Sequence, residues 1–448
     1  MLPLRAIVNQ KPRFIISDLH LGDGRQEGLE DFDHHAAENF VNFFREVAAL
    51  GGVKVILNGD FIDFPQIQLN EKSASPQRFL GTTEAESTAR LQHAMAGHPD
   101  EFHALEEFLA REGNELLLIT GNHDVDLCWD QTLRTLMQRI GATEENFKTG
   151  IAYREGGVYV THGHQYSDDN QIDVPINFTF NRLNSCWGTL FVEHFFNRIE
   201  AQYPLLDNAR PMWKAALSAL LYEDLLVTGQ FAAELLMFVK NFRVPLRDYA
   251  ISALLGWQPK TRSLREKNVE NLVAGVQIDA LREKLQALRH QPEFRQGFDA
   301  TLQDLDNTQW DRLLSGVDSH EQDVQDLLLN GESSHPQSRS FFSSTDNYQQ
   351  AARCIARYQP AIRVVVMGHT HVGIDAKLLQ AEGSGRTFLY FNSGTWVPSY
   401  TIPWWKLPRL DDLTDSDLYT PNSGVIRCTG ADDTLEVKYV SRWQDVLA

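Results

Sequence analysis

Five short motifs in this chain consist of residues that commonly bind divalent metal ions. In chain order they are Asp18-Leu19-His20, Gly59-Asp60, Gly121-Asn122-His123-Asp124, His162-Gly163-His164 and Gly368-His369-Thr370-His371. Mixed imidazole and carboxylate ligands without a thiolate suit manganese, iron, zinc or nickel. The residue types therefore predict a metal centre, provided that the five motifs meet in space.

Each motif follows a short apolar segment that is typical of a buried β-strand. These segments are Phe14–Ile16, Val53–Leu57, Leu116–Ile119, Val158–Val160 and Val364–Met367. In an open α/β sheet, ligands bind outside the carboxyl ends of the strands. We therefore expect the five strand ends to bring the motifs to one common site.

Helices are expected between these strands. Residues 36–50, 99–113 and 131–140 have apolar residues at helical spacing, whereas residues 66–97 are polar and mixed and are expected to be a surface excursion. Strands that alternate with helices in this way predict a mainly parallel sheet covered by helices.

The C-terminal part returns to the same pattern. A helix is expected over residues 346–359 and a strand over residues 363–367. Three further runs, residues 388–391, 424–427 and 435–440, are expected to form a second sheet.

The ordered set of motifs resembles the calcineurin-like metallophosphoesterases. Their pattern is Asp-x-His, Gly-Asp, Gly-Asn-His-Asp or Glu, a His, and then Gly-His-x-His, and it is matched here in order over residues 12–166 and 347–400. The resemblance implies an α/β fold, the calcineurin-like four-layer α/β/β/α sandwich. It also implies a metal-dependent phosphoric ester hydrolase.

Residues 15–22, Ile-Ile-Ser-Asp-Leu-His-Leu-Gly, most resemble the UDP-2,3-diacylglucosamine pyrophosphatases of lipid A synthesis and their relatives. This chain departs from the common bacterial form of that enzyme in two respects. It has His123 where that form has Arg, and its insertion is much longer. His123 is compatible with monoesters, diesters or pyrophosphates as substrates.

The resemblance implies seven metal ligands at the strand ends. They are Asp18, His20 and His371 for a first metal, Asn122, His162 and His369 for a second, and Asp60 as the bridge between them. Two divalent ions are expected, with Mn²⁺ preferred and iron, zinc or nickel open. His164 is left as a neighbour of the ligands, a substrate contact or a loop histidine.

Two further residues are expected to act in the reaction. The resemblance places His123 toward the leaving group, as a general acid or an electrostatic donor. Asp124 is expected to orient His123 through the second ring nitrogen of the imidazole. Asp63 is expected to support the site rather than bind a metal, and Asn58 is either a turn residue or a hydrogen-bond donor.

Such a centre suits the hydrolysis of a phosphate ester or pyrophosphate by a bridging hydroxide. Two divalent ions roughly 3.5–4 Å apart acidify a water and bind phosphoryl oxygens. Two carboxylates and one hydroxide leave about one positive charge on the pair of metals, which attracts an anionic substrate. The alternatives are a protein phosphatase or nuclease on the same scaffold, or a non-catalytic binding scaffold.

The amino-acid composition limits which partners and which cellular compartment are expected. The chain has 448 residues, a net charge of -19 and a pI of about 5.2, which argues against binding along an extended nucleic acid. The four cysteines form no CxxC motif, so a reduced, cytoplasmic compartment is expected. No secretory signal or membrane span is expected in the sequence, which predicts a soluble protein and leaves peripheral membrane contact open.

The motifs divide the chain into three parts. We expect an N-terminal core part over residues 1–169, a large mainly helical insertion over 170–346, and a C-terminal core part over 347–448. The insertion has a long apolar segment at residues 213–242. We expect the insertion to be a cap, a lid, a pocket for a lipid-linked or small phosphorylated substrate, or an oligomer contact.

One late segment has two interpretations. The run Phe391–Trp396 follows a strand and precedes a loop with Trp404 and Trp405. It is expected either to form a rim of the site or to pack structurally.

Overall fold

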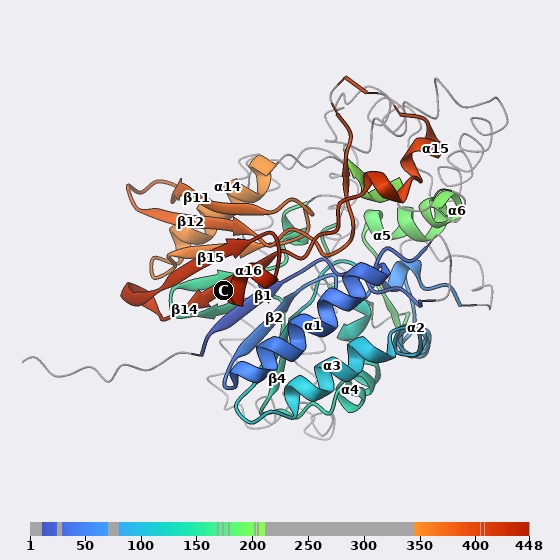
Figure 1. The fold of residues 1–448 in the computed structure, drawn as a ribbon, viewed down its shortest axis with the longest axis horizontal. Helices are drawn as coiled ribbons and strands as arrows, with labels where there is room; N and C mark the ends of the chain where they lie inside the picture. The colour runs from blue at the N-terminus through green and yellow to red at the C-terminus, as the bar shows by residue number, and fades with distance from the viewer. Residues whose placement is uncertain are drawn as a thin grey trace, which may run out of the picture. The chain divides into compact units, whose positions relative to one another are not determined.

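The computed structural model describes residues 11–24, 29–69, 80–167, 170–172, 174–177, 180–200, 203, 206–210, 345–403, 405–406 and 408–447. All of these belong to one compact unit, which both ends of the chain build together. Figure 1 shows strands from the N-terminal and C-terminal parts side by side, with the blue strand β1 between the red strand β14 and the blue strand β2.

The first sheet has the order β15-β14-β1-β2-β3-β4. Its strands are β1 (Arg13–Ile16), β2 (Lys54–Asn58), β3 (Glu115–Ile119), β4 (Phe147–Gly150), β14 (Val425–Thr429) and β15 (Glu436–Val440). Strands β1 to β4 are parallel, whereas β14 pairs antiparallel with β1 and β15 pairs antiparallel with β14.

The second sheet has the order β11-β12-β10-β6-β5. Its strands are β5 (Tyr153–Glu155), β6 (Val158–Val160), β10 (Val364–Met367), β11 (Ile374–Gln380) and β12 (Thr387–Asn392). Strands β6, β10 and β12 run parallel, so their carboxyl ends share one edge. The motifs after β6 and β10 therefore reach the same edge of this sheet.

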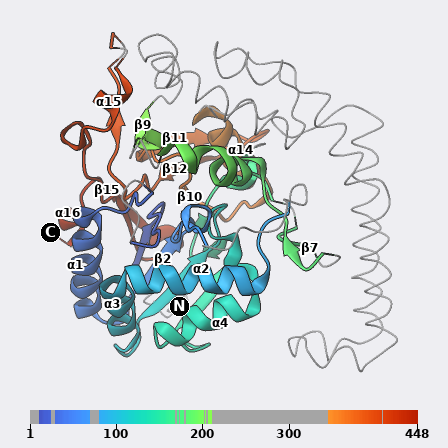
Figure 2. The same ribbon diagram turned by 90° about the vertical axis from the view of Figure 1, so that its right-hand side faces the viewer.

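Helices cover the outer face of each sheet, as Figures 1 and 2 show. They are α1 (His34–Leu50), α2 (Glu84–Gly97), α3 (Pro99–Leu109) and α4 (Asp130–Arg139) with the first sheet, and α14 (Thr345–Tyr358) with the second. Successive side chains of each strand point to opposite faces of its sheet, so one set packs against the helices and the other against the facing sheet. Phe14 and Ile16 of β1 face the helices, while Ile15 packs between the sheets against residues such as Val366. The predicted four-layer α/β/β/α sandwich is confirmed.

Helix α1 illustrates how local sequence sets an element. The side chain of Asp33 accepts a hydrogen bond from the backbone N–H of Ala36, and Gly51 ends the helix with a φ of 66°. Helices usually begin after a residue whose side-chain oxygen accepts a backbone hydrogen bond, and they often end at a glycine. The face of α1 that carries Phe40, Phe44 and Val47 is buried.

Two sequence predictions were wrong in part. Residues 424–427 and 435–440 were expected in the second sheet, but β14 and β15 extend the first sheet instead. Pairing with β14 satisfies the hydrogen-bonding edge of β1, which would otherwise be open. Residues 66–97 were expected to be a surface excursion, but α2 lies within them, with Leu91 and Ala94 fully buried.

The insertion predicted over residues 170–346 lies outside the described residues from 211 to 344, including the apolar segment 213–242. The described elements of its first part are β7 (Ile176–Asn177), β8 (Arg182–Leu183), α5 (Trp187–Phe191), the π-helix η4 (Val192–Phe196), α6 (Asn197–Glu200), η5 (Leu206–Asn208) and β9 (Ala209–Arg210). Among the described residues, no helix combines the length and the apolar character that crossing a membrane requires.

Candidate metal centre

The structure brings the seven predicted ligands together at the carboxyl ends of β1, β2, β3, β6 and β10. Three groups of side chains there offer ligand atoms within 4.8 Å of one another: Asp18 with His20 and His371, Asp60 with His162 and His369, and His20 with Asp63 and His123. The first two groups match the predicted sharing of ligands between two metals. Whether these residues bind metals stays a prediction.

Five of the seven predicted ligands have a left-handed backbone conformation. They are Asp18, His20, Asp60, His369 and His371, with φ values between 52° and 68°. Such a conformation costs on the order of 1–3 kcal/mol for a residue with a side chain, and it persists where the surrounding structure over-determines it. Strain of this kind, repeated at the carboxyl ends of strands from both sheets, is typical of a functional site.

Short distances define the first group. The Nε2 atoms of His20 and His371 lie 3.0 Å apart, and His371 Nε2 lies 3.4 Å from Asp18 Oδ1. Asp63 Oδ2 accepts a hydrogen bond of 2.7 Å from Nδ1 of His20. A carboxylate on the far nitrogen of a histidine orients the near nitrogen, here Nε2, toward a metal.

The second group contains two hydrogen-bond acceptors that face each other. His162 Nδ1 donates to the carbonyl oxygen of Asn58 at 2.8 Å, so Nε2 carries the lone pair of the neutral ring. That Nε2 lies 3.0 Å from Asp60 Oδ2. Two acceptors at this distance require a positive charge between them, either a proton or a metal ion. The arrangement therefore fits a metal.

Asn122 supplies a second observation that fits a metal. Its Oδ1 atom is buried without a hydrogen-bond partner among the described residues. Buried polar atoms are nearly always paired, so an orphaned oxygen beside a cluster of ligands fits the coordination of an ion. Asp60 connects the two groups, since its Oδ2 also lies 3.9 Å from His20 Nε2.

Burial and mutual charge perturb the carboxylates and imidazoles of the site. Burial raises the pKa of Asp18 to about 6. Burial acts the same way on Asp60, but His162 and His123 outweigh it and hold its pKa well below the usual value. Burial lowers the pKa of His162, and Asp60 more than reverses this and raises it to about 9. Burial, together with the neighbouring His162, lowers the pKa of His164 to about 3.

The orienting group of His123 differs from the prediction. Asp63 Oδ1 lies 2.9 Å from His123 Nδ1, whereas both oxygens of Asp124 accept backbone N–H groups, from Phe61 at 3.0 Å and from Gly121. Asp124 therefore ties together the turns after β2 and β3. The expected contact of Asp124 with the ring of His123 was wrong, because the backbone N–H groups of these turns occupy its oxygens.

The turn after β10 and the run after β12 hold the Asp18 loop. The backbone N–H of His369 donates to both oxygens of Asp18 at 3.0 Å, and Thr395 Oγ1 donates to the carbonyl of Asp18 at 2.7 Å. Trp396 is fully buried and its Nε1 donates to the carbonyl of Gly424. The run Phe391–Trp396 thus supports the site through packing. Trp404 lies outside the described residues, and Trp405 is exposed.

Glycine is required where two turns approach ligand side chains. A Cβ atom on Gly121 would lie 2.1 Å from Asp60 Oδ1, and one on Gly59 would lie 2.3 Å from the ring of His162. Neither distance is sterically possible. Both glycines therefore allow the backbone to pass directly behind the site.

His164 lies beside the site without joining any of the three groups. Its ring centroid is 5.5 Å from that of His162, and its Nδ1 is buried without a partner among the described residues. His162, by contrast, faces Asp60. The geometry favours His162 as the ligand.

Two residues near the ligands were not identified from the sequence. The amide of Asn170 lies 3.2 Å from His369 Nε2, and Arg210 Nη2 lies 3.3 Å from His371 Nδ1. Both lie within the predicted insertion, after the last motif of the N-terminal part. No local pattern marks them, because their place depends on how this segment folds back.

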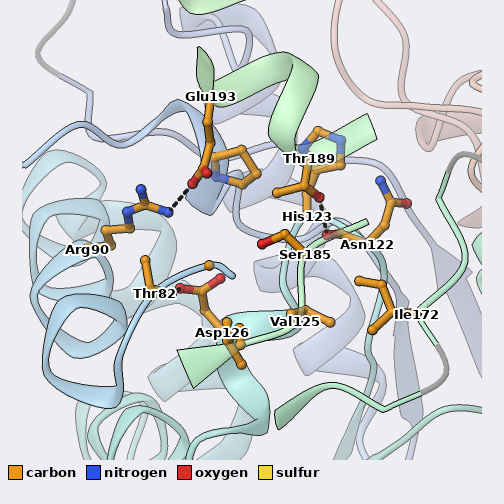
Figure 3. Close-up of a pocket in the computed structure, with 13 residues that line it drawn as sticks. Thr82, Arg90, Asn122, His123, Val125, Asp126, Ile172, Ser185, Thr189 and Glu193 are labelled. Carbon is orange, nitrogen blue, oxygen red and sulfur yellow. Dashed lines mark hydrogen bonds and ion pairs between the residues drawn. The ribbon is translucent and has the colours of Figure 1, made fainter. Parts of the chain in front are cut away.

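A pocket lies on the side of Asn122 and His123, as Figure 3 shows. Its other walls come from α2, from η2 (Val125–Cys128) and from the segment between β8 and η4. In its wall, Arg90 Nη1 donates to Glu193 Oε1 at 2.8 Å, and Thr189 Oγ1 donates to the carbonyl of Asn122 at 3.4 Å.

Comparison with known proteins agrees with this geometry. Residues 12–229 match the family model described as calcineurin-like phosphoesterase. This match supports the superfamily to which the motifs pointed, and in general terms a metal-dependent phosphoesterase. The narrower resemblance to UDP-2,3-diacylglucosamine pyrophosphatases is not supported. A search among curated proteins finds no match to the chain.

The matched range runs past residue 169, and the Gly368–His371 motif lies beyond its end. The division of the chain at residues 169 and 346 stays a prediction.

Proposed function

We propose that this protein is a two-metal phosphoesterase that hydrolyses a phosphate ester or pyrophosphate bond. The observation that carries the proposal is the convergence of the seven predicted ligands, above all the paired acceptors His162 Nε2 and Asp60 Oδ2 at 3.0 Å. When bound, two divalent ions would supply an activated water and charge compensation for the phosphoryl group. Asp18, His20 and His371 would hold one ion, and Asn122, His162 and His369 the other. Asp60 would bridge them.

The chain's own groups prepare the site for this reaction. Asp63 fixes two imidazoles at once, since it contacts Nδ1 of His20 and Nδ1 of His123. Burial lowers the pKa of His123, but Asp63 and Asp60 raise it to about 10, so the ring carries a proton on both nitrogens. The remaining nitrogen, Nε2, is then the group that donates to the leaving-group oxygen. The backbone N–H of His123 donates to Asp60 Oδ1 at 2.9 Å, which couples the position of this donor to the proposed bridge.

The metal is proposed to be manganese, since imidazole, carboxylate and amide ligands suit Mn²⁺, with iron, zinc and nickel as alternatives. A small or lipid-linked phosphorylated substrate is proposed, and contact with a membrane surface would come through the insertion.

Hydrolysis of p-nitrophenyl phosphate and of its bis ester, without metal and with manganese, iron, zinc or nickel, tests the proposal. Activity is expected only with a divalent metal, and loss of the bridge in Asp60→Asn is expected to abolish it. His123→Ala is expected to reduce kcat by about 10²-fold or more, the usual contribution of a general acid. Full activity of Asp60→Asn would refute the mechanism. Hydrolysis of neither ester with any of the four metals would favour a binding scaffold.

A further inference from the structure

Two buried serines lie behind Asp18, one of the seven predicted metal ligands. Ser17 directly follows β1 of the first sheet, and Ser393 directly follows β12 of the second sheet. Both side chains are fully buried. Their Oγ atoms lie 2.6 Å apart, and Ser17 Oγ also contacts Asp18 Oδ2. The two sheets are therefore joined by hydroxyl groups at the position of a proposed ligand.

The direction of these hydrogen bonds follows from the number of protons, because each hydroxyl group supplies one. A carboxylate oxygen only accepts, so Ser17 donates to Asp18 Oδ2. The proton of Ser17 is then used, and the short contact between the two hydroxyls requires Ser393 to donate to Ser17 Oγ. The carbonyl oxygen of Met367, 3.1 Å from Ser393 Oγ, already accepts the backbone N–H of Ser393 at 2.9 Å. The chain of donors therefore runs from Ser393 through Ser17 to Asp18.

The two oxygens of Asp18 have different surroundings. Oδ2 accepts from Ser17, whereas Oδ1 lies 3.4 Å from Nε2 of His371, which belongs to the same group of ligand atoms. The backbone N–H of His369 lies 3.0 Å from both oxygens, so it does not distinguish them. The hydroxyl of Ser17 therefore makes the two oxygens of this carboxylate unequal.

The segment that carries Ser393 is fixed by other hydrogen bonds. The side chain of Asn392 donates to the carbonyl of Gly368 at 2.8 Å, and its Oδ1 accepts from the backbone N–H of Gly394 at 3.0 Å. The backbone N–H of Ser393 donates to Met367. These bonds place Ser393 Oγ independently of the Asp18 side chain, so Ser393 can hold the hydroxyl of Ser17 in one direction.

We infer that Ser393 and Ser17 are positioning residues that turn Oδ1 of Asp18 toward the first metal. A hydroxyl that donates to one oxygen of a ligating carboxylate fixes that oxygen and leaves the other for the ion, and such outer contacts tune metal affinity. Hydrogen bonds in a chain strengthen one another, so Ser393 acts on Asp18 through Ser17. The inference rests on the proposed function, in which Asp18 is a metal ligand.

Titration of four variants with manganese tests this role. Ser17→Ala removes the donor to Asp18, Ser393→Ala removes the donor to Ser17, and the double variant removes both. Ser87→Ala is the matched control, because Ser87 is also fully buried and donates to a buried carboxylate, Asp126 Oδ1, at 2.6 Å. Calorimetry would measure manganese affinity, and thermal unfolding of the metal-free protein would measure stability separately.

For Ser17→Ala we expect manganese affinity to fall by about tenfold to hundredfold, the usual cost of losing a group that orients a metal ligand. Ser393→Ala should lower it by about twofold to tenfold, because one hydrogen bond between neutral groups is lost. Since Ser393 acts only through Ser17, the double variant should match Ser17→Ala rather than show the product of both effects. Ser87→Ala should lower thermal stability and keep wild-type manganese affinity.

Three results would overturn the inference. One is unchanged manganese affinity in Ser17→Ala, even if its stability falls. Another is a double variant that shows the product of the two single effects, because Ser393 would then act by a different route. The third is an equal loss of manganese affinity in Ser87→Ala, which would mean that removing any buried serine hydroxyl has this effect.

The proposed function fails separately from this inference. A wild type that binds manganese and hydrolyses neither ester refutes the hydrolase, while the titrations still support or refute the role of the two serines. A wild type that binds none of the four metals overturns both.

Discussion

Replacing Asp63 by Asn tests how one buried carboxylate organises the proposed centre. Asp63 is 2% exposed, and its two oxygens face two different imidazoles, Oδ2 toward His20 Nδ1 at 2.7 Å and Oδ1 toward His123 Nδ1 at 2.9 Å. An amide has one acceptor oxygen, so the side chain of the Asp63→Asn variant can serve only one of these rings. The other ring then faces an NH₂ group, and its orientation is lost.

The size of the effect follows from these contacts. One hydrogen bond to a charged group is worth about 1.5–3 kcal/mol, which corresponds to about a tenfold to hundredfold change in an equilibrium or rate constant. If the amide serves His123, metal affinity should fall through His20. If it serves His20, kcat should fall through His123. In both cases, the product of metal affinity and kcat should fall by about tenfold or more.

The measurements are manganese affinity by titration and kcat on p-nitrophenyl phosphate at saturating metal. Asp130→Asn is the matched control, because Asp130 lies on the exposed side of α4 with its side chain 82% exposed. The control should behave as wild type. Wild-type metal affinity together with wild-type kcat in Asp63→Asn would show that Asp63 does not orient either imidazole.

Two further predictions concern packing and pH. Gly121→Ala should lose bound manganese and activity, because the new Cβ would lie 2.1 Å from Asp60 Oδ1, whereas Gly385→Ala, with open space around it, should retain both. His98 lies 3.3 Å from Glu30; burial lowers its pKa, but Glu30 raises it above 6.5 overall. Protonated His98 therefore stabilises the fold at low pH, and this contribution is lost as pH rises through the folded-state pKa. The His98→Gln substitution should therefore lower Tm more near about pH 6 than near about pH 8.5. An equal decrease in Tm at both pH values would contradict this role of His98.

The sequence alone predicted the five strands that precede the motifs, and it predicted the ligand set of the proposed centre. Each motif and its apolar strand lie within about ten residues of one another, so the information is local. Asp18, Asp60 and His369 were placed at strand ends for this reason, and the structure brings them together. The fold class also followed, because alternating strands and helices admit few layer arrangements.

Tertiary structure decided what depends on contacts between distant segments. The pairing of β14 with β1 places Cys428 opposite Arg13 in the first sheet. No local pattern specifies which of the two sheets a C-terminal strand will join. Asp63 and Asp124 have the same side chain, and both lie near a motif. The sequence therefore could not show which of them contacts His123, and the structure shows that it is Asp63. Arg210 reaches His371 because β9 pairs with β13 (Tyr400–Thr401). Such placements arise from long-range packing, in which the direction of a side chain is set by residues that are distant along the chain.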